Sequence, residues 1–262
     1  MPPDLVPIRH RAKCFARGAN PLAGLASLAA LLLLWQIAAG LQGDFTVLPS
    51  PADVAVAFTA MLATGELARH VAASLGRLAA GWSLGAAAGL GIGLAMALHP
   101  VVRAATMPPV SALFALPKIA LLPLFIVWLG IGEGTKIFTI ALGVFSPMVM
   151  ATLSGIDSVD RGLIRMAQSF DLPPRRIITA VVLPGALPAL LTGVRTTASI
   201  AVVLLVGAEM IAARHGIGAL ALTSAGLMRT DRLFVALALL AALGLIFAAL
   251  LNLAERRLLN WR

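Results

Sequence analysis

Long runs of apolar residues alternate with short polar segments along the chain. A helix needs about 20 apolar residues to cross the hydrocarbon layer of a membrane, and six stretches approach that length. The pattern therefore predicts an all-α integral membrane protein with about six transmembrane helices. The predicted spans cover residues 22–41, 75–98, 110–129, 135–153, 187–211 and 233–253.

The first apolar run could instead be a cleaved signal peptide, because basic residues precede it and Ala38-Ala39-Gly40 resembles a cleavage site. Signal cores usually have about 7 to 15 apolar residues, and the run over 22–41 is longer. We therefore interpret it as a helix that follows a basic N-terminal tail, residues 1–21. Residues 22–262 then form one transmembrane domain.

The segment between the first two spans predicts a short external helix. Ser50 is suited to an N-cap, Pro51 to the first helical position, and Asp53 to the positive end of a helix. The chain then approaches the second span through Arg69 and His70, which we interpret as anchors at the membrane interface.

Four glycines recur at every fourth position within the second span: Gly81, Gly85, Gly89 and Gly93. On a helix they form one nearly straight groove, and small residues let another helix approach closely. The spacing predicts a helix-packing surface. It leaves open whether the neighbouring helix belongs to this chain or to another copy.

Two of the spans contain prolines that predict kinks. Pro117 and Pro123 lie in the third span and Pro147 in the fourth, and proline removes a helical hydrogen bond. Kinks make cavities for a solute possible, and simple packing irregularity would explain these prolines as well. Ionisable residues within spans are expensive to bury and are therefore candidates for a pathway. Interface anchoring or pairing between helices would explain them as well. These residues are Arg77, Lys118, Arg195 and Glu209.

The composition agrees with a membrane environment and argues against nucleic acid. Apolar residues make up 60% of the chain and charged residues 12%, whereas soluble domains are about half apolar and a quarter charged. The net charge is +9, but its basic residues lie at the ends of apolar spans. With a cytoplasmic N-terminus, twelve Lys and Arg fall inside and five outside. This excess predicts that both termini are cytoplasmic.

The chain carries no recognisable catalytic or nucleotide-binding motif. Neither glycine-rich stretch, 89–93 or 130–136, has the sequence and context of a phosphate-binding loop. We therefore expect no ATP, Mg²⁺ or other cofactor in this chain. A membrane enzyme or metal site would need clustered ligands, and the histidines are dispersed in the sequence: His10, His70, His99 and His215.

The longest predicted cytoplasmic loop, about residues 155–184, contains an amphipathic helix. Leu163, Met166, Ala167 and Phe170 recur at i, i+3, i+4 and i+7, and the proline pair at 173–174 ends the helix. Such a helix is suited to a groove in a partner protein or to the lipid surface. Periodicity alone does not decide between the two.

Residues 165–171, 175–178 and 182–188 resemble the EAA loop of binding-protein-dependent ABC transporter permeases. Segments 48–51, 74–77, 116–124, 128–132 and 208–210 resemble the branch that imports nitrate, sulfonates, taurine, bicarbonate or thiamine precursors. The resemblance covers the chain from about residue 22 onward. It implies that these loop residues couple to an ATPase: Arg165, Met166, Ala167, Phe170, Asp171, Arg175, Arg176 and Pro184.

The resemblance also implies a type I ABC importer permease, a non-catalytic subunit in the bacterial inner membrane. In the family, two permease subunits form the path for the solute. Two cytoplasmic ATPase subunits bind ATP and Mg²⁺ and grip the loops, and a periplasmic or lipid-anchored binding protein delivers the solute. For this chain we expect a homodimer and a small anionic solute. A stand-alone secondary transporter is the alternative, although the spans show no convincing inverted repeat.

Two loop residues depart from the family pattern. Arg165 stands where Glu is usual, which reverses a charge at the partner surface. Asp171 stands where Gly is usual, at a bend that we expect to require a positive φ. Asp tolerates that left-handed region better than most residues.

Overall fold

The computed structural model describes residues 21–42 and 48–258, and every regular element within them is helical. The predicted all-α class is therefore confirmed. The helices, in chain order, are α1 (Pro21–Gln42), α2 (Pro51–Ala63), α3 (Glu66–Leu98), α4 (Pro100–Ala115), η2 (Lys118–Leu121), α5 (Leu122–Leu129), α6 (Glu133–Asp157), α7 (Arg161–Ser169), α8 (Pro174–Ile177), η3 (Ile178–Val182), α9 (Leu183–Ala212), α10 (Ile217–Gly226) and α11 (Thr230–Leu258).

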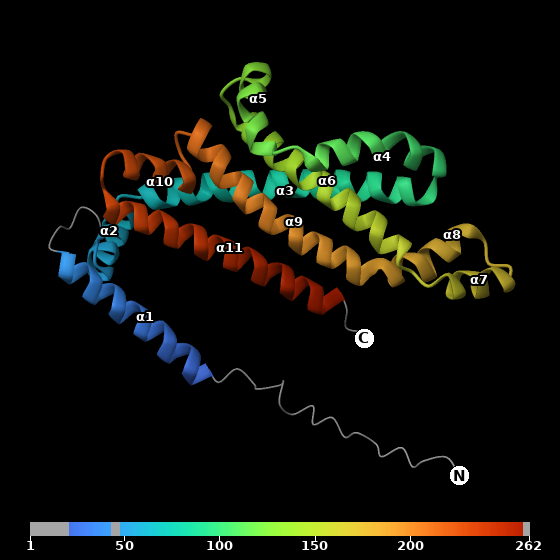
Figure 1. The fold of residues 1–262 in the computed structure, drawn as a ribbon, viewed down its shortest axis with the longest axis horizontal. Helices are drawn as coiled ribbons and strands as arrows, with labels where there is room; N and C mark the ends of the chain where they lie inside the picture. Colours follow the sequence, from blue (N-terminus) through green and yellow to red (C-terminus); the bar gives the residue numbers. More distant parts are fainter. Residues whose placement is uncertain (1–20, 43–47, 259–262) are drawn as a thin grey trace, which may run out of the picture.

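Figure 1 shows a bundle whose long helices α3, α6, α9 and α11 run along the longest axis of the molecule. The helices α2 and α10 lie at one end of this axis, and α7 and α8 lie at the other. We call them the α10 end and the α7 end. The α5 helix projects from the side of the bundle (Figure 1).

Four stretches are long and apolar enough to cross a membrane: α3, α6, the run Pro174–Ala212 that ends with α9, and Thr230–Leu253 within α11. A bent helix pair, Pro100–Ala115 with Lys118–Leu129, meets the same criterion as a fifth. With α1, of which Ala29–Leu41 is a shorter apolar stretch, the apolar helices match the expected number of about six.

The third predicted span, 110–129, is wrong as a single helix. The α4 helix already begins at Pro100, and its axis meets that of the following helix at 92°. The break lies at Leu116, which is extended (φ −72°, ψ 137°), because a residue before proline is disfavoured in the helical region. Pro123 causes no second break, since it falls within the first turn of α5, where its missing N–H is tolerated.

The start of α2 confirms the predicted cap. The Ser50 hydroxyl accepts a hydrogen bond from the Asp53 backbone N–H, and the Asp53 carboxylate accepts one from the Ser50 backbone N–H at 3.0 Å. Pro51 occupies the first helical position. The Ser50 hydroxyl also donates to the Asp53 carboxylate at 2.7 Å, and this bond, with the one from the Ser50 N–H, holds the pKa of the exposed Asp53 below its usual value. The stability that the charged carboxylate contributes to the cap is therefore complete above the usual pKa, and it is lost as the pH falls through the lowered pKa.

The glycine groove of α3 packs against α6 of the same chain. A Cβ added to Gly81 would lie 2.7 Å from Cβ of Ile140, and one added to Gly93 would lie 2.6 Å from Cβ of Thr152. Gly85 and Gly89 are blocked in the same way by α6. The absence of side chains at these four positions thus allows α3 and α6 to form the most extensive helix contact in the bundle.

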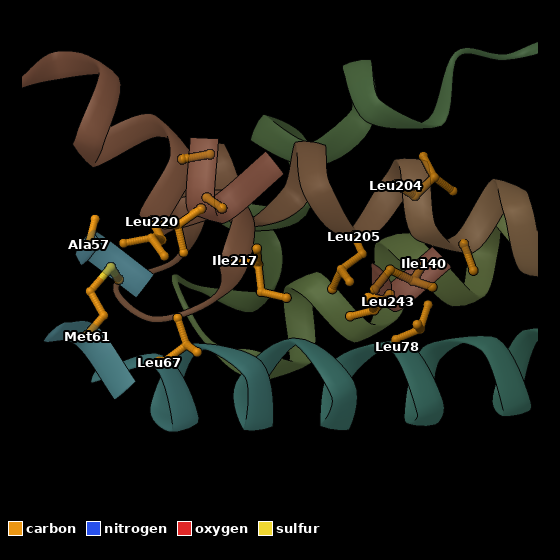
Figure 2. Packing of buried hydrophobic residues seen from close by; sticks show 14 of the residues in the cluster. Ala57, Met61, Leu67, Leu78, Ile140, Leu204, Leu205, Ile217, Leu220 and Leu243 are labelled. Carbon is orange, nitrogen blue, oxygen red and sulfur yellow. The ribbon is translucent and has the colours of Figure 1, made fainter. Parts of the chain in front are cut away.

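The main hydrophobic core fills the space between α3, α6 and α9 and extends under α10 toward α2. Leu78, Ile140 and Leu205 lie together in this core, toward the right in Figure 2, and each is at most 2% exposed. Ala57 and Met61 of α2 close it at the α10 end (Figure 2). This core holds the helix ends of the α10 end in fixed positions, which matters for the polar residues described below.

Candidate functional site

The α7 helix is bounded by two local signals. At its start the Asp160 carboxylate accepts a hydrogen bond from the Gly162 N–H at 2.7 Å. At its end Asp171 has φ +51°, and the N–H groups of Asp171 and Leu172 donate to the carbonyls of Gln168 and Ala167. This is a Schellman C-cap. The expected positive φ at Asp171 is confirmed.

One edge of the apolar stripe on α7 packs against its own chain. Ala167 is 5% exposed and lies in a small core with Val159, Ile177 and Val182, against which Ile164 also packs. The stripe is therefore not a single free face. Ala167, which the resemblance assigns to partner coupling, holds α7 to the start of the following helices instead of pointing outward.

The other edge of the stripe is exposed. Leu163, Met166 and Phe170 are 48%, 55% and 73% exposed. A helix that is fixed along one edge and bare along the other presents a preformed apolar ridge to a partner. The same two short helices, α7 and α8, also carry four exposed basic residues: Arg161, Arg165, Arg175 and Arg176. We call these seven residues the α7 surface.

The α8 part of the α7 surface is joined to the long α9 helix without a break, whereas a turn at residues 170–173 separates α7 from α8. The α8 helix continues into the π-helical turn η3, where the Leu183 N–H donates to the Ile178 carbonyl. Pro184 follows directly and cannot donate to the carbonyl four residues earlier, which accounts for the wider turn. Pro184 therefore lies in the first turn of α9, and the run from Pro174 to Ala212 is one stiff element.

A buried polar network lies at the opposite end of the bundle. Arg77 of α3 donates to the Glu209 carboxylate of α9 at 2.7 Å, and both side chains are at most 4% exposed. Ser74 and the Gly218 N–H also donate to that carboxylate, at 2.7 Å and 2.9 Å. The predicted pathway candidates Arg77 and Glu209 thus pair between helices.

The network extends to the first turn of α6. The Arg77 guanidinium donates to Glu133 through its Nη2 at 2.8 Å, and Lys136 donates to the same carboxylate oxygen at 2.8 Å. Glu133 is 59% exposed, whereas Lys136 is 5% exposed. One arginine therefore links the ends of three long helices that are far apart in the sequence.

His70 belongs to this network and is not an interfacial anchor. Its side chain is buried, and its Nδ1 lies 2.8 Å from the carbonyl oxygen and 3.0 Å from the nitrogen of Gly216. Gly216 has φ +145°, and a Cβ there would lie 2.5 Å from the Glu209 carboxylate. The Ser74 hydroxyl accepts from the Ile217 N–H at 2.8 Å. The loop before α10 is therefore fixed to α3 by side chains.

The sequence carries a signal for this network that the prediction missed. His70, Ser74 and Arg77 recur at i, i+4 and i+7, so they share one face of α3, and the groove glycines continue that face. The histidines are also less dispersed than expected, since the rings of His70 and His215 lie 5.7 Å apart. No group of three metal-ligating side chains occurs within residues 21–42 and 48–258.

The other two pathway candidates lie elsewhere. Lys118 of η2 donates to the Phe114 carbonyl at 2.8 Å across the bend after α4. Arg195 of α9 pairs with Glu255 of α11 and lines a small cavity of about 220 Å³ between these helices. The structure therefore brings together Arg77 and Glu209, and leaves Lys118 and Arg195 separate.

Comparison with known proteins identifies the family. A family model described as "Binding-protein-dependent transport system inner membrane component" matches residues 87–260. SsuC of Bacillus subtilis (strain 168), named as an aliphatic sulfonates transport permease, is 35% identical over 91% of this chain and 87% of its own length. TauC of Escherichia coli (strain K12), a taurine transport system permease protein, is 35% identical over 90% and 88%.

Solved structures show the same fold. A chain of the MetNI methionine ABC transporter in an inward-facing conformation matches with a TM-score of 0.62 and 22% identity, over 73% of this chain and 95% of that chain. The relatives confirm the predicted resemblance to the sulfonate and taurine branch. The protein belongs to the family of binding-protein-dependent transport system inner membrane components.

Proposed function

We propose that this chain is the permease subunit of an ABC importer for small organic sulfonates and that a separate ATPase docks on the α7 surface. The observation that carries the proposal is the exposed ridge of Leu163, Met166 and Phe170 on a helix whose other edge is fixed by Ala167. A preorganised ridge binds with little ordering of its own side chains.

Docking there suits transmission of motion. Arg175 and Arg176 of the α7 surface lie in the 39-residue run Pro174–Ala212, which is packed along α6. A push on α7 would pass through the small core around Ala167 to this run, and Glu209 lies near the far end of the run. ATP and Mg²⁺ would be bound by the ATPase, and this chain would convert its closure into rocking of the bundle.

The charge distribution supports a cytoplasmic α7 end. In the topology predicted from the sequence, twelve Lys and Arg fall in the segments on the same side as the loop that contains α7 and five in the segments on the other side, and cytoplasmic loops carry such an excess. The α10 end would then face the periplasm, where a solute-binding protein delivers its cargo. A second copy of the chain would complete the path.

The proposed solute class follows from the relatives. SsuC and TauC are named for aliphatic sulfonates and taurine, and each covers about nine-tenths of this chain. The solute class is tested by measuring the uptake of radiolabelled taurine or methanesulfonate into vesicles that contain this chain, its ATPase and its binding protein. Uptake of neither compound, together with normal ATP hydrolysis, would reject the sulfonate class and leave the importer itself standing.

The docking test uses two negative charges on the same helix. Met166→Glu places a carboxylate on the exposed ridge, whereas Gln168→Glu adds a nearly isosteric carboxylate to an exposed position away from the ridge. We expect the tagged wild type and Gln168→Glu to copurify with the ATPase in mild detergent, and Met166→Glu to lose at least nine-tenths of it.

Ala167→Arg is a poorer probe, because a buried arginine would disrupt the core between α7 and α9 and so act indirectly. Equal ATPase recovery with Met166→Glu and with the wild type would place the docking site elsewhere. If no ATPase copurifies with the wild type, a stand-alone carrier becomes the better explanation.

A further inference from the structure

The α10 end contains a basic pocket beside the network of Arg77 and Glu209, and His70 and His215 line it on the side of that network. It has a volume of about 300 Å³ and lies between the start of α3, the loop before α10, and the α10–α11 turn. Ligand pockets of about 300 to 1,000 Å³ are typical for small molecules. The charged and hydroxyl side chains that matter here are Glu66, Arg69, Arg214, Ser224, Arg229 and Arg232.

The charges around this pocket do not balance. Four arginines line it against one carboxylate, Glu66, which pairs with Arg232 at 3.3 Å. A second carboxylate, Asp231, lies 3.6 Å from Arg229. Arg69 and Arg214 are exposed and form no ion pair with any residue in 21–42 or 48–258. The pocket therefore keeps a positive charge that its own chain does not neutralise.

The helix ends increase this positive potential. Arg69 lies in the first turn of α3 and Arg232 in the first turn of α11, where the positive end of the helix dipole disfavours a cation. Arg229 lies near the C-terminal end of α10, whose negative partial charge offsets only part of the positive potential. An arrangement that is unfavourable for the chain alone becomes favourable when an anion occupies the pocket.

A serine hydroxyl also belongs to the pocket lining. Ser224 of α10 lines the pocket, and the residue as a whole is only 3% exposed. Its backbone carbonyl accepts a hydrogen bond from the Arg229 N–H at 2.9 Å, which fixes this residue beside Arg229. A hydroxyl can donate a hydrogen bond to an oxyanion in the pocket.

We infer that this pocket is a binding site for a small oxyanion of the sulfonate or phosphate type. Guanidinium groups bind such anions through paired N–H donors. The guanidinium N–H groups of Arg69 and Arg214 are available for this, because neither side chain forms an ion pair within the described residues. The bound group comes either from a dissolved anion or from the headgroup of an acidic lipid. An acidic loop of a partner protein fits less well, because a concave pocket of this size holds one headgroup instead of an extended surface.

The experiment is calorimetric titration of methanesulfonate into the full chain in phosphatidylcholine nanodiscs. Dimethyl sulfone, a neutral molecule of similar shape, is the ligand control. The variants are Arg69→Gln, Arg214→Gln and Ser224→Ala, and the charge-matched control is Arg103→Gln, whose side chain pairs with Asp157 elsewhere in the fold. Thermal unfolding of each variant verifies that it is folded.

We expect saturable binding of methanesulfonate, at least fivefold weaker in Arg69→Gln and in Arg214→Gln and about twofold weaker in Ser224→Ala. The control variant should bind as the wild type does, and dimethyl sulfone should not bind. Repeating the titration with phosphatidylglycerol in the nanodiscs separates the sources: unchanged binding indicates a dissolved anion, and lost binding indicates a lipid headgroup that fills the site.

The inference is overturned if methanesulfonate does not bind the wild type, or if it binds Arg69→Gln and Arg214→Gln equally well. Binding of a solute-binding protein that is weakened by these variants, without any methanesulfonate binding, would assign the pocket to protein docking. The titration contains no ATPase, so its result does not depend on whether an ATPase docks on the α7 surface. Likewise, the copurification test of docking does not depend on whether the pocket binds an anion.

Discussion

At the residue scale, Asp171 shows how a local exception is accommodated. A residue with a side chain in the left-handed region is strained by about 1 to 2 kcal/mol relative to glycine, and Asp171 adopts φ +51° at the end of α7. The Schellman hydrogen bonds require this conformation whatever the residue is. The bend is therefore a property of the loop, whichever residue occupies it.

Asp171→Gly should stabilise the loop by about 1 kcal/mol, and Asp171→Val should destabilise it by at least as much, because a β-branched residue tolerates positive φ poorly. Hydrogen exchange of the amides in α7 measures both effects. Identical exchange rates in the two variants would mean that the conformation at this position does not limit opening of the loop.

The Glu209 carboxylate accepts hydrogen bonds from three partners and is fully buried. Removing one partner of a buried ion pair costs about 3 to 5 kcal/mol, so Glu209→Ala should unfold at markedly lower denaturant concentration than the wild type. Glu255→Ala removes the acid of the more exposed pair with Arg195 and should cost about 1 kcal/mol or less. If the two variants had similar denaturation midpoints, Glu209 would not stabilise the protein more than Glu255 does.

At the element scale, the contact between α3 and α6 depends on the absence of side chains. A Cβ at Gly85 would lie 2.9 Å from Cα of Ala141 and from Cβ of Val144, whereas nothing lies within 4 Å of a Cβ at Gly91. Gly85 is therefore a position at which an added Cβ is blocked, and Gly91, less than two turns away on the same helix, is a position at which it is not.

Gly85→Ala should destabilise the protein by about 1 to 3 kcal/mol, because overpacking forces the two helices apart. Gly91→Ala should be neutral or stabilising by up to about 1 kcal/mol, since alanine loses less conformational freedom in a helix. Denaturant titration of both variants in the same detergent is the measurement. A destabilised Gly91→Ala would mean that this face of α3 also contacts a second copy.

Sequence pattern predicted individual helices better than contacts between them. The α3 groove and the cap of α2 depend on residues that are close together in the chain, so the spacing of those residues was enough to predict both features. The sequence predicted a kink near Leu116 but not a bend of 92°, because a proline predicts that a helix bends and not by how much. The polar network was missed because Arg77 lies 56 residues from Glu133 and 132 from Glu209, and their pairing depends on how the bundle closes.

At the scale of the whole molecule, the orientation is open to a direct test. The chain has a single cysteine, Cys14, in the N-terminal segment outside the described residues. A membrane-impermeant maleimide should label it in inverted vesicles and not in intact spheroplasts, because twelve basic residues favour that side. In a Cys14→Ser background, Leu227→Cys at the α10 end should show the opposite pattern. Labelling of both cysteines from the same side would reject the proposed orientation.

The interlocked pair of α3 and α6 has a mechanical consequence. Because side chains of α6 fill every gap left by the glycines, the two helices cannot slide past each other and must turn as one lever. The 25 residues of α6 make this lever roughly 37 Å long. A tilt on the order of 10°, similar to rotations in known switching proteins, would move its far end by roughly 6 Å. A modest push beside α7 would thus be amplified into a displacement wide enough to open or shut a gate for a small molecule.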